Sequence, residues 1–99
     1  MRLTADQARL IREAVHKRFG PEARVWLFGS RVNDEARGGD IDLLVEVEQT
    51  IAQPFSASIG LETDLQYSLG DQKIDILLHH GTAPPGPIQR IAKTTGIEL

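Results

Sequence analysis

The chain has 99 residues and a mass of 10.9 kDa, a size that predicts one small domain spanning residues 1–99. It contains no cysteine, which excludes a disulfide framework, a thiolate zinc site and a cysteine nucleophile. Its N-terminal helical stretch is charged throughout and no run of about 18 apolar residues follows, so we expect neither a membrane span nor a signal peptide. These features predict a cytoplasmic protein that folds by packing alone.

The formal charge of −3 is distributed unevenly along the chain. Residues 1–37 contain eight Lys and Arg against five Asp and Glu, whereas residues 38–99 contain three against nine. A nucleic-acid surface needs clustered basic residues, so direct DNA binding is not expected. The distribution fits two interpretations: a phosphate ligand near the basic half with a metal ion near the acidic half, or ordinary surface variation.

The first third of the chain predicts a helix and a strand. Apolar residues recur at helical spacing between Thr4 and Phe19, and Thr4 with Gln7 has the pattern of a capping box. Residues 24–28 form a β-rich run that stops at Gly29-Ser30, which predicts a strand with an abrupt turn at its C-terminal end. The polar residues 31–37 allow a short helix.

The remaining elements alternate strand and helix. We expect strands over 40–47 and 73–79, helices over 54–69 and 88–95, and a Pro- and Gly-rich loop over 80–87. In the first of these strands four aliphatic residues share one face, and Asp40 and Asp42 share the other. In the second, Asp75 stands on the face opposite Ile74 and Ile76. Three strands separated by helical stretches predict a small layer of helices on a sheet.

The aspartates within the apolar strands are the strongest chemical signal. A carboxylate between Ile and Leu loses hydration unless it is paired, hydrogen-bonded or bound to a metal, so three buried aspartates would be unexplained in a fold without a site. The period of two places Asp40 and Asp42 within reach of one cation, and Asp75 supplies a third carboxylate if the strands are neighbours. Ligands that are all oxygen suit Mg²⁺ or Mn²⁺ rather than zinc.

Gly29-Ser30 lies upstream of these carboxylates, where a strand ends. Glycine lets a phosphate approach the main chain, and the serine hydroxyl with nearby N–H groups can bind its oxygens. Taken alone, the pair is more typical of an ordinary turn than of a phosphate site. Arg31 and Arg37 either clamp a triphosphate there or are solvated surface residues.

Two further groups of residues have two interpretations each. Trp26 either stacks on a base or belongs to the core, and its place in an inner strand favours the core. His79 and His80 are either metal ligands or a pair at the end of a strand, and the absence of other His or Cys nearby in sequence favours the second.

The joint pattern resembles the nucleotidyltransferase superfamily that includes the DNA polymerase β palm. It consists of Leu27-Phe28-Gly29-Ser30-Arg31, then Gly39-Asp40-Ile41-Asp42-Leu43-Leu44-Val45, then Lys73-Ile74-Asp75-Ile76-Leu77. Within this superfamily the chain is similar to the minimal nucleotidyltransferases (MNT), including the MntA-like antitoxins of HEPN/MNT systems. The resemblance covers nearly the whole chain and implies an α+β fold with a three-stranded mixed sheet and flanking helices.

The resemblance also implies a reaction and a set of site residues. Gly29 and Ser30, with Arg31, would bind the phosphates of ATP or another nucleoside triphosphate, and Asp40 and Asp42 would hold two Mg²⁺ ions. Asp75 would bind the second metal and help to activate an acceptor hydroxyl. The implied acceptor is a tyrosine of a partner HEPN toxin, with which the chain would form an oligomer and act as an antitoxin.

Two other functions belong to different classes. The first is a non-catalytic antitoxin that neutralises its toxin by binding, against which an intact Gly-Ser pair and three carboxylates argue. The second is nucleotidylation of a small molecule, which normally needs an additional acceptor domain that 99 residues do not accommodate.

Overall fold

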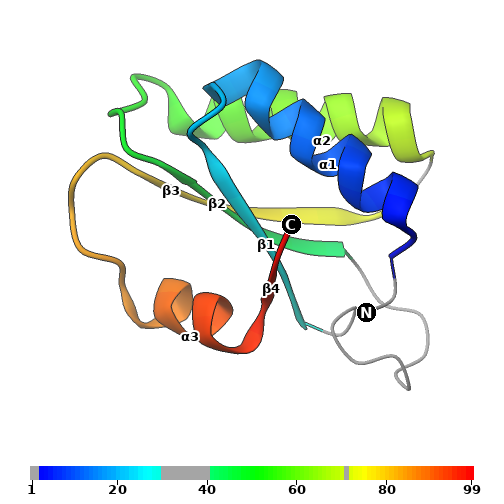
Figure 1. Cartoon of the computed structure of the whole chain (residues 1–99). Helices are drawn as coiled ribbons and strands as arrows, with labels where there is room; N and C mark the ends of the chain where they lie inside the picture. Colours follow the sequence, from blue (N-terminus) through cyan, green and yellow to red (C-terminus); the bar gives the residue numbers. More distant parts are fainter. Residues whose placement is uncertain (1–2, 30–40, 71) are drawn as a thin grey trace.

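The computed structural model describes residues 3–29, 41–70 and 72–99, and within them it has an α+β fold. A four-stranded sheet in the order β3-β2-β1-β4 carries α1 and α2 on one face and α3 on the other (Figure 1). In chain order the elements are α1 (Ala5–Phe19), β1 (Arg24–Phe28), β2 (Ile41–Val47), α2 (Pro54–Leu69), β3 (Ile74–His80), α3 (Pro87–Thr95) and β4 (Ile97–Glu98).

The first helix begins at the predicted capping box. The Thr4 Oγ1 accepts the Gln7 N–H at 3.0 Å, and the Gln7 Oε1 accepts the Thr4 N–H at 2.9 Å. These bonds satisfy N–H groups that the first turn of a helix leaves without partners. The apolar stripe of α1 faces the sheet, with Ile11 and Val15 fully buried. The sequence pattern is therefore confirmed both at the start of the helix and on its inner face.

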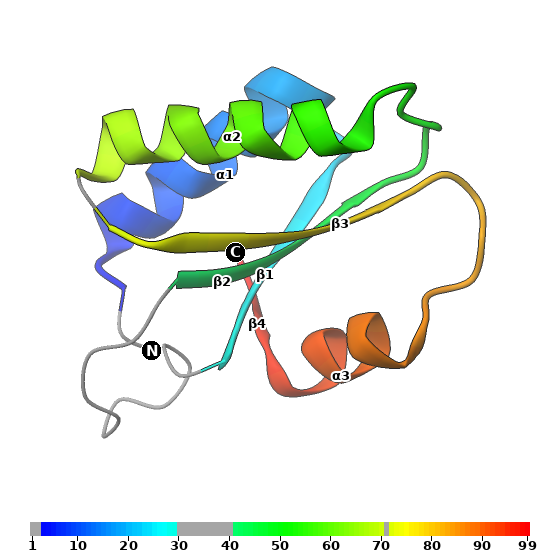
Figure 2. The same ribbon diagram turned by 180° about the vertical axis from the view of Figure 1, so that it is seen from behind.

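The sheet is mixed, because β1 and β2 are antiparallel whereas β2 and β3 are parallel. A parallel pair needs a crossover connection, and α2 supplies it. Figure 2 shows α2 on the β3 side of the helical layer, with α1 behind it. This crossover sets the N-terminal ends of β2 and β3 next to each other.

The expectation of three strands was wrong by one. The chain ends in β4, whose residues Glu98 and Ile97 pair with Trp26 and Leu27 of β1. Two residues are too few to show the alternation that identifies a strand in a sequence. β4 is a strand because it pairs with the distant β1, so no local sequence pattern predicts it.

The two faces of the sheet differ in what covers them. The face under α1 and α2 carries the main core, in which Ile41, Leu43 and Val45 are fully buried, as predicted. The opposite face has a smaller apolar cluster, in which Ala92 of α3 packs with Trp26 and Leu44. Because α3 is short, the smaller cluster covers only the middle of that face. No helix in the described residues is long and apolar enough to cross a membrane.

Candidate functional site

The site is assembled where β1 ends and where β2 and β3 begin. Asp42 of β2 is in register with Asp75 of the parallel strand β3 and with Phe28 of the antiparallel strand β1. Residues in register on neighbouring strands project to the same face of a sheet. The structure thus brings together Asp42 and Asp75, which are 33 positions apart in the sequence, on the face that α3 partly covers.

Gly29, directly after β1, lies against the Asp42 carboxylate. Its φ is +76°, in the left-handed region that favours glycine, and a Cβ at this position would collide with Asp42 Oδ2 and lie 3.1 Å from its Cγ. A side chain here would therefore have to displace the carboxylate. This contact explains why glycine follows β1, and it places the exposed main chain of Gly29 beside Asp42.

The predicted burial of the aspartates was wrong for the two that the structure describes. Asp42 is half-buried and Asp75 is exposed, and no described polar or charged residue is buried. The reason is their position, since both stand at strand ends beyond the apolar cluster of Trp26 and Leu44, and β3 is an edge strand. Water therefore reaches Asp75.

Three predicted site residues, Ser30, Arg31 and Asp40, lie outside the described residues. Their roles remain predictions, as does the helix allowed for 31–37. In the described ranges no group of three or more His, Asp and Glu is placed to hold a metal ion. The carboxylates of Asp42 and Asp75 are the all-oxygen donors that Mg²⁺ prefers, so this part of the donor set fits the implied metal.

The other end of the same face carries a polar network that the sequence did not predict. Glu46, four residues after Asp42 on β2, is 3.2 Å from Lys93 Nζ of α3 and 3.3 Å from His79 Nδ1 of β3. Beside it, Arg24 donates two hydrogen bonds of 2.9 Å to Glu98. The period of two places Glu46 and His79 on this face, but their pairing depends on strand register and on α3.

The Arg24–Glu98 pair perturbs both of its members. The hydrogen bond from Arg24 lowers the pKa of the Glu98 carboxyl below its ordinary value, and the hydrogen bond to Glu98 raises the pKa of the Arg24 guanidinium. Both side chains are about half exposed, so water weakens the effect on stability.

Trp26, His79 and His80 pack or form hydrogen bonds within the fold. Trp26 is 5% exposed, and the charged groups of Arg24 and Lys93 are 4.8 and 5.1 Å from its ring centre. The favoured assignment of Trp26 to the core is confirmed. His79 Nε2 is 2.9 Å from the Ala83 carbonyl oxygen, and His80 Nδ1 accepts the Ile51 N–H at 3.0 Å. Both rings fasten β3 to neighbouring segments.

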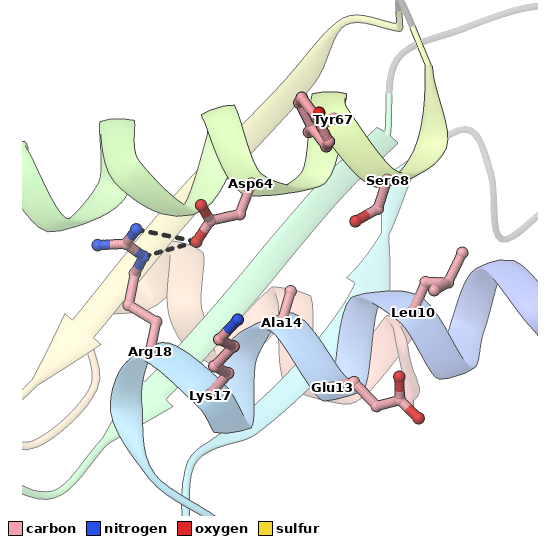
Figure 3. Close-up of a pocket in the computed structure, with 8 residues that line it drawn as sticks. All are labelled: Leu10, Glu13, Ala14, Lys17, Arg18, Asp64, Tyr67 and Ser68. Carbon is pink, nitrogen blue, oxygen red and sulfur yellow. Dashed lines mark hydrogen bonds and ion pairs between the residues drawn. The ribbon is translucent and has the colours of Figure 1, made fainter.

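A separate groove lies between α1 and α2, on the far side of the sheet from Asp42 and Asp75. It has a volume of about 590 Å³, and the ion pair of Arg18 with Asp64 lies at one end (Figure 3). Tyr67 stands at its rim and is 95% exposed. The groove is lined by Leu10, Glu13, Ala14, Lys17, Arg18, Asp64, Tyr67 and Ser68. Its walls carry none of the predicted site residues.

Comparison with known proteins gives one assignment. The family model described as "Polymerase beta, Nucleotidyltransferase" matches residues 11–98, a range that includes β1, β2 and β3. A comparison with curated proteins finds no significant match. The matched range covers most of the chain and contains both carboxylates that the register brings together. The chain therefore belongs to the polymerase beta nucleotidyltransferase family.

Proposed function

We propose that the chain is a Mg²⁺-dependent nucleotidyltransferase that transfers AMP from ATP to a protein hydroxyl. Family membership supports nucleotidyl transfer from a nucleoside triphosphate. The observation that carries the proposal is the register of Asp42 with Asp75, together with the contact of Gly29 on the Asp42 carboxylate. These features put two carboxylates and the exposed main chain of Gly29 at one open corner of the sheet.

Each part of the corner has a role in this proposal. Gly29, with Ser30 and Arg31, binds the triphosphate, because glycine permits close approach of phosphate oxygens to main-chain N–H groups. Asp42 and Asp75, with Asp40, would hold Mg²⁺, which would supply positive charge against the negative charge that develops on the reacting oxygens. The exposed Asp75 orients the acceptor hydroxyl and takes its proton.

The reaction is an in-line displacement at the α-phosphorus of ATP. A bond forms between the acceptor oxygen and the phosphorus, and the bond from the phosphorus to the pyrophosphate oxygen breaks. The hydroxyl proton passes to a carboxylate at the corner, and pyrophosphate leaves. No covalent intermediate on the protein is required, so catalysis depends on the placement of the acceptor and on charge neutralisation.

We further propose that the acceptor is a tyrosine of a HEPN-type toxin and that its modification makes the chain an antitoxin. The support is the resemblance of the three motifs to minimal nucleotidyltransferases. The exposure of Asp75 on the α3-bearing face of the sheet also supports it, because a folded partner can reach this residue from that face. A deeply enclosed Asp75 would instead have favoured a small acceptor.

The test uses the chain co-expressed with a HEPN-domain partner and supplied with Mg²⁺ and ATP. Intact-mass measurement of the partner should show the addition of AMP, and Asp42→Asn should remove it. A partner that is neutralised without ATP, and equally by the Asp42→Asn variant, would overturn catalysis and leave a binding antitoxin.

A second measurement tests the nucleotide site without any partner. Ligands that bind only the folded state stabilise it by mass action, by about 2.7 kcal/mol at a hundredfold excess over the dissociation constant. Millimolar Mg²⁺ with ATP should therefore raise the thermal unfolding midpoint of the purified chain. An unchanged midpoint would contradict a triphosphate site at this corner.

A further inference from the structure

Apart from the charge of Asp75 near its start, the outer edge of β3 has none of the features that normally protect an edge strand. In the described part of the chain, β3 is the terminal strand of the sheet and pairs only with β2. It is seven residues long and contains neither proline nor glycine, and its middle residues are Ile76, Leu77 and Leu78, all partly exposed. Natural proteins usually keep their edge strands short, bulged or charged, because the outward N–H and C=O groups of an edge strand pair readily with another strand.

The flank of α2 above this edge is also apolar. Phe55 is 78% and Ile59 47% exposed, and the four-residue spacing places them on one side of the helix. Gly60 and Asp64, which approach Arg18 of α1, lie on the other side. Both views of the molecule place α2 over the β3 side of the sheet (Figures 1 and 2). Phe55 and Ile59 therefore extend the apolar surface that begins at the β3 edge.

We propose that a second copy of this chain covers this surface, by antiparallel pairing of β3 with β3 of the other copy. The strand is self-complementary when the pairing is centred on Leu77. All seven residues of β3 then find partners, with Leu77 opposite Leu77 and Ile76 opposite Leu78. Two-fold symmetric contacts of this kind are the commonest in protein oligomers.

Charge favours pairing centred on Leu77 over pairing centred on Asp75, which is shifted by two residues. Pairing centred on Leu77 sets Asp75 of one copy opposite His79 of the other. Pairing centred on Asp75 sets the two carboxylates opposite each other, which is destabilising, and shortens the overlap of the strands. The symmetric dimer has one continuous eight-stranded sheet, and the α2 flanks of the two copies approach each other above it. The Asp42–Asp75 corners of both copies then open on the same face.

Matched pairs of lysine substitutions test the surface. Analytical ultracentrifugation of the wild-type chain, at up to about 0.1 mM, should give twice the 10.9 kDa mass of one chain. Phe55→Lys with Ile59→Lys should weaken the dimer by about tenfold or more. Ile88→Lys with Ile91→Lys is the control, because these residues of α3 are 63% and 61% exposed and lie on the other face of the sheet. It should leave the dimer unchanged.

A cross-link tests the register. The chain has no cysteine, so Leu77→Cys introduces a single thiol. At the centre of the proposed pairing this thiol lies opposite the same thiol of the other copy. Mild oxidation should give a covalent dimer with Leu77→Cys but not with the exposed control Ile91→Cys. A monomeric wild-type chain, a dimer disrupted only by the α3 substitutions, or no cross-link at position 77 would each overturn the proposal. None of these outcomes bears on nucleotide transfer, which is measured separately.

Discussion

On the sheet face that carries α3, the carboxylates at the two ends have different neighbours. At one end, Asp42 and Asp75 are side by side, so that two like charges meet in register. At the other end, four residues along the same strand, Glu46 is held by Lys93 and His79 at 3.2 and 3.3 Å. Like charges in register repel each other, whereas the Lys93 ammonium attracts the Glu46 carboxylate. We propose that the first end serves the transfer reaction, whereas the second end stabilises the fold.

The largest expected effect is that of Asp42→Asn on transfer. Loss of one of the carboxylates that hold Mg²⁺ should lower labelling from ATP marked at the α-phosphate by about a hundredfold or more. The thermal midpoint without metal should stay the same or rise slightly, because a like-charge pair is removed. If Asp42→Asn unfolds the protein or leaves labelling intact, the functional assignment of this end is wrong.

Gly29→Ala should damage the same end through the main chain. Alanine at a φ of +76° is strained, and its Cβ meets the Asp42 carboxylate, so we expect a loss of about 1–3 kcal/mol together with a loss of Mg²⁺-ATP binding. Gly20→Ala is the matched control, because Gly20 also has a positive φ but open space around its Cβ position. The control should lose stability alone. Normal Mg²⁺-ATP binding by Gly29→Ala would contradict the proposed phosphate site.

Glu46→Gln should have the reverse profile of Asp42→Asn. The Glu46 side chain is 18% exposed, and its neutralisation leaves Lys93 and His79 without their carboxylate partner. We expect a loss of about 1–3 kcal/mol in chemical denaturation, with labelling per folded molecule unchanged. Equal stability of Glu46→Gln and the wild type would remove the contrast between the two ends.

The smallest expected effect concerns pH and the Arg24–Glu98 pair. Because the pKa of Glu98 is lowered in the folded state, its contribution is complete above the ordinary pKa of a glutamate and disappears as the pH falls through the lowered value. Glu98→Gln should therefore cost under about 1 kcal/mol at neutral pH, since both side chains are half exposed. The difference between variant and wild type should vanish in acid. A difference that persists there would assign the effect to packing.

Local patterns predicted most of the fold, and the register explains what they missed. The capping box of Thr4, the apolar stripe of α1 and the aliphatic face of β2 each lie within one element, where periodicity is informative. The neighbouring position of Asp42 and Asp75 also followed from treating the two strands as adjacent. Periodicity says which face a residue occupies, but not how far the opposite layer extends. The exposure of Asp75 was therefore missed.

The network around Glu46 was beyond the sequence for a different reason. Its members come from β2, β3 and α3, and Arg24 meets Glu98 across 74 residues. Such pairs become visible only when the strand order is known. The same holds for β4, whose two residues have meaning only beside β1.

The pairing of β4 with β1 has a consequence for the order in which the molecule opens. Leu27 and Ile97 close a loop of about 70 residues, whereas β2, α2 and β3 form one contiguous stretch of chain. Closing a long loop costs more chain entropy than closing a short one. The pairing of only two residues offsets little of this cost. In native-state hydrogen exchange, β4 and α3 should therefore be released together, at a lower free energy than the central strands. Each such opening would lift Ala92 from Trp26 and briefly widen access to the face that carries Asp42 and Asp75.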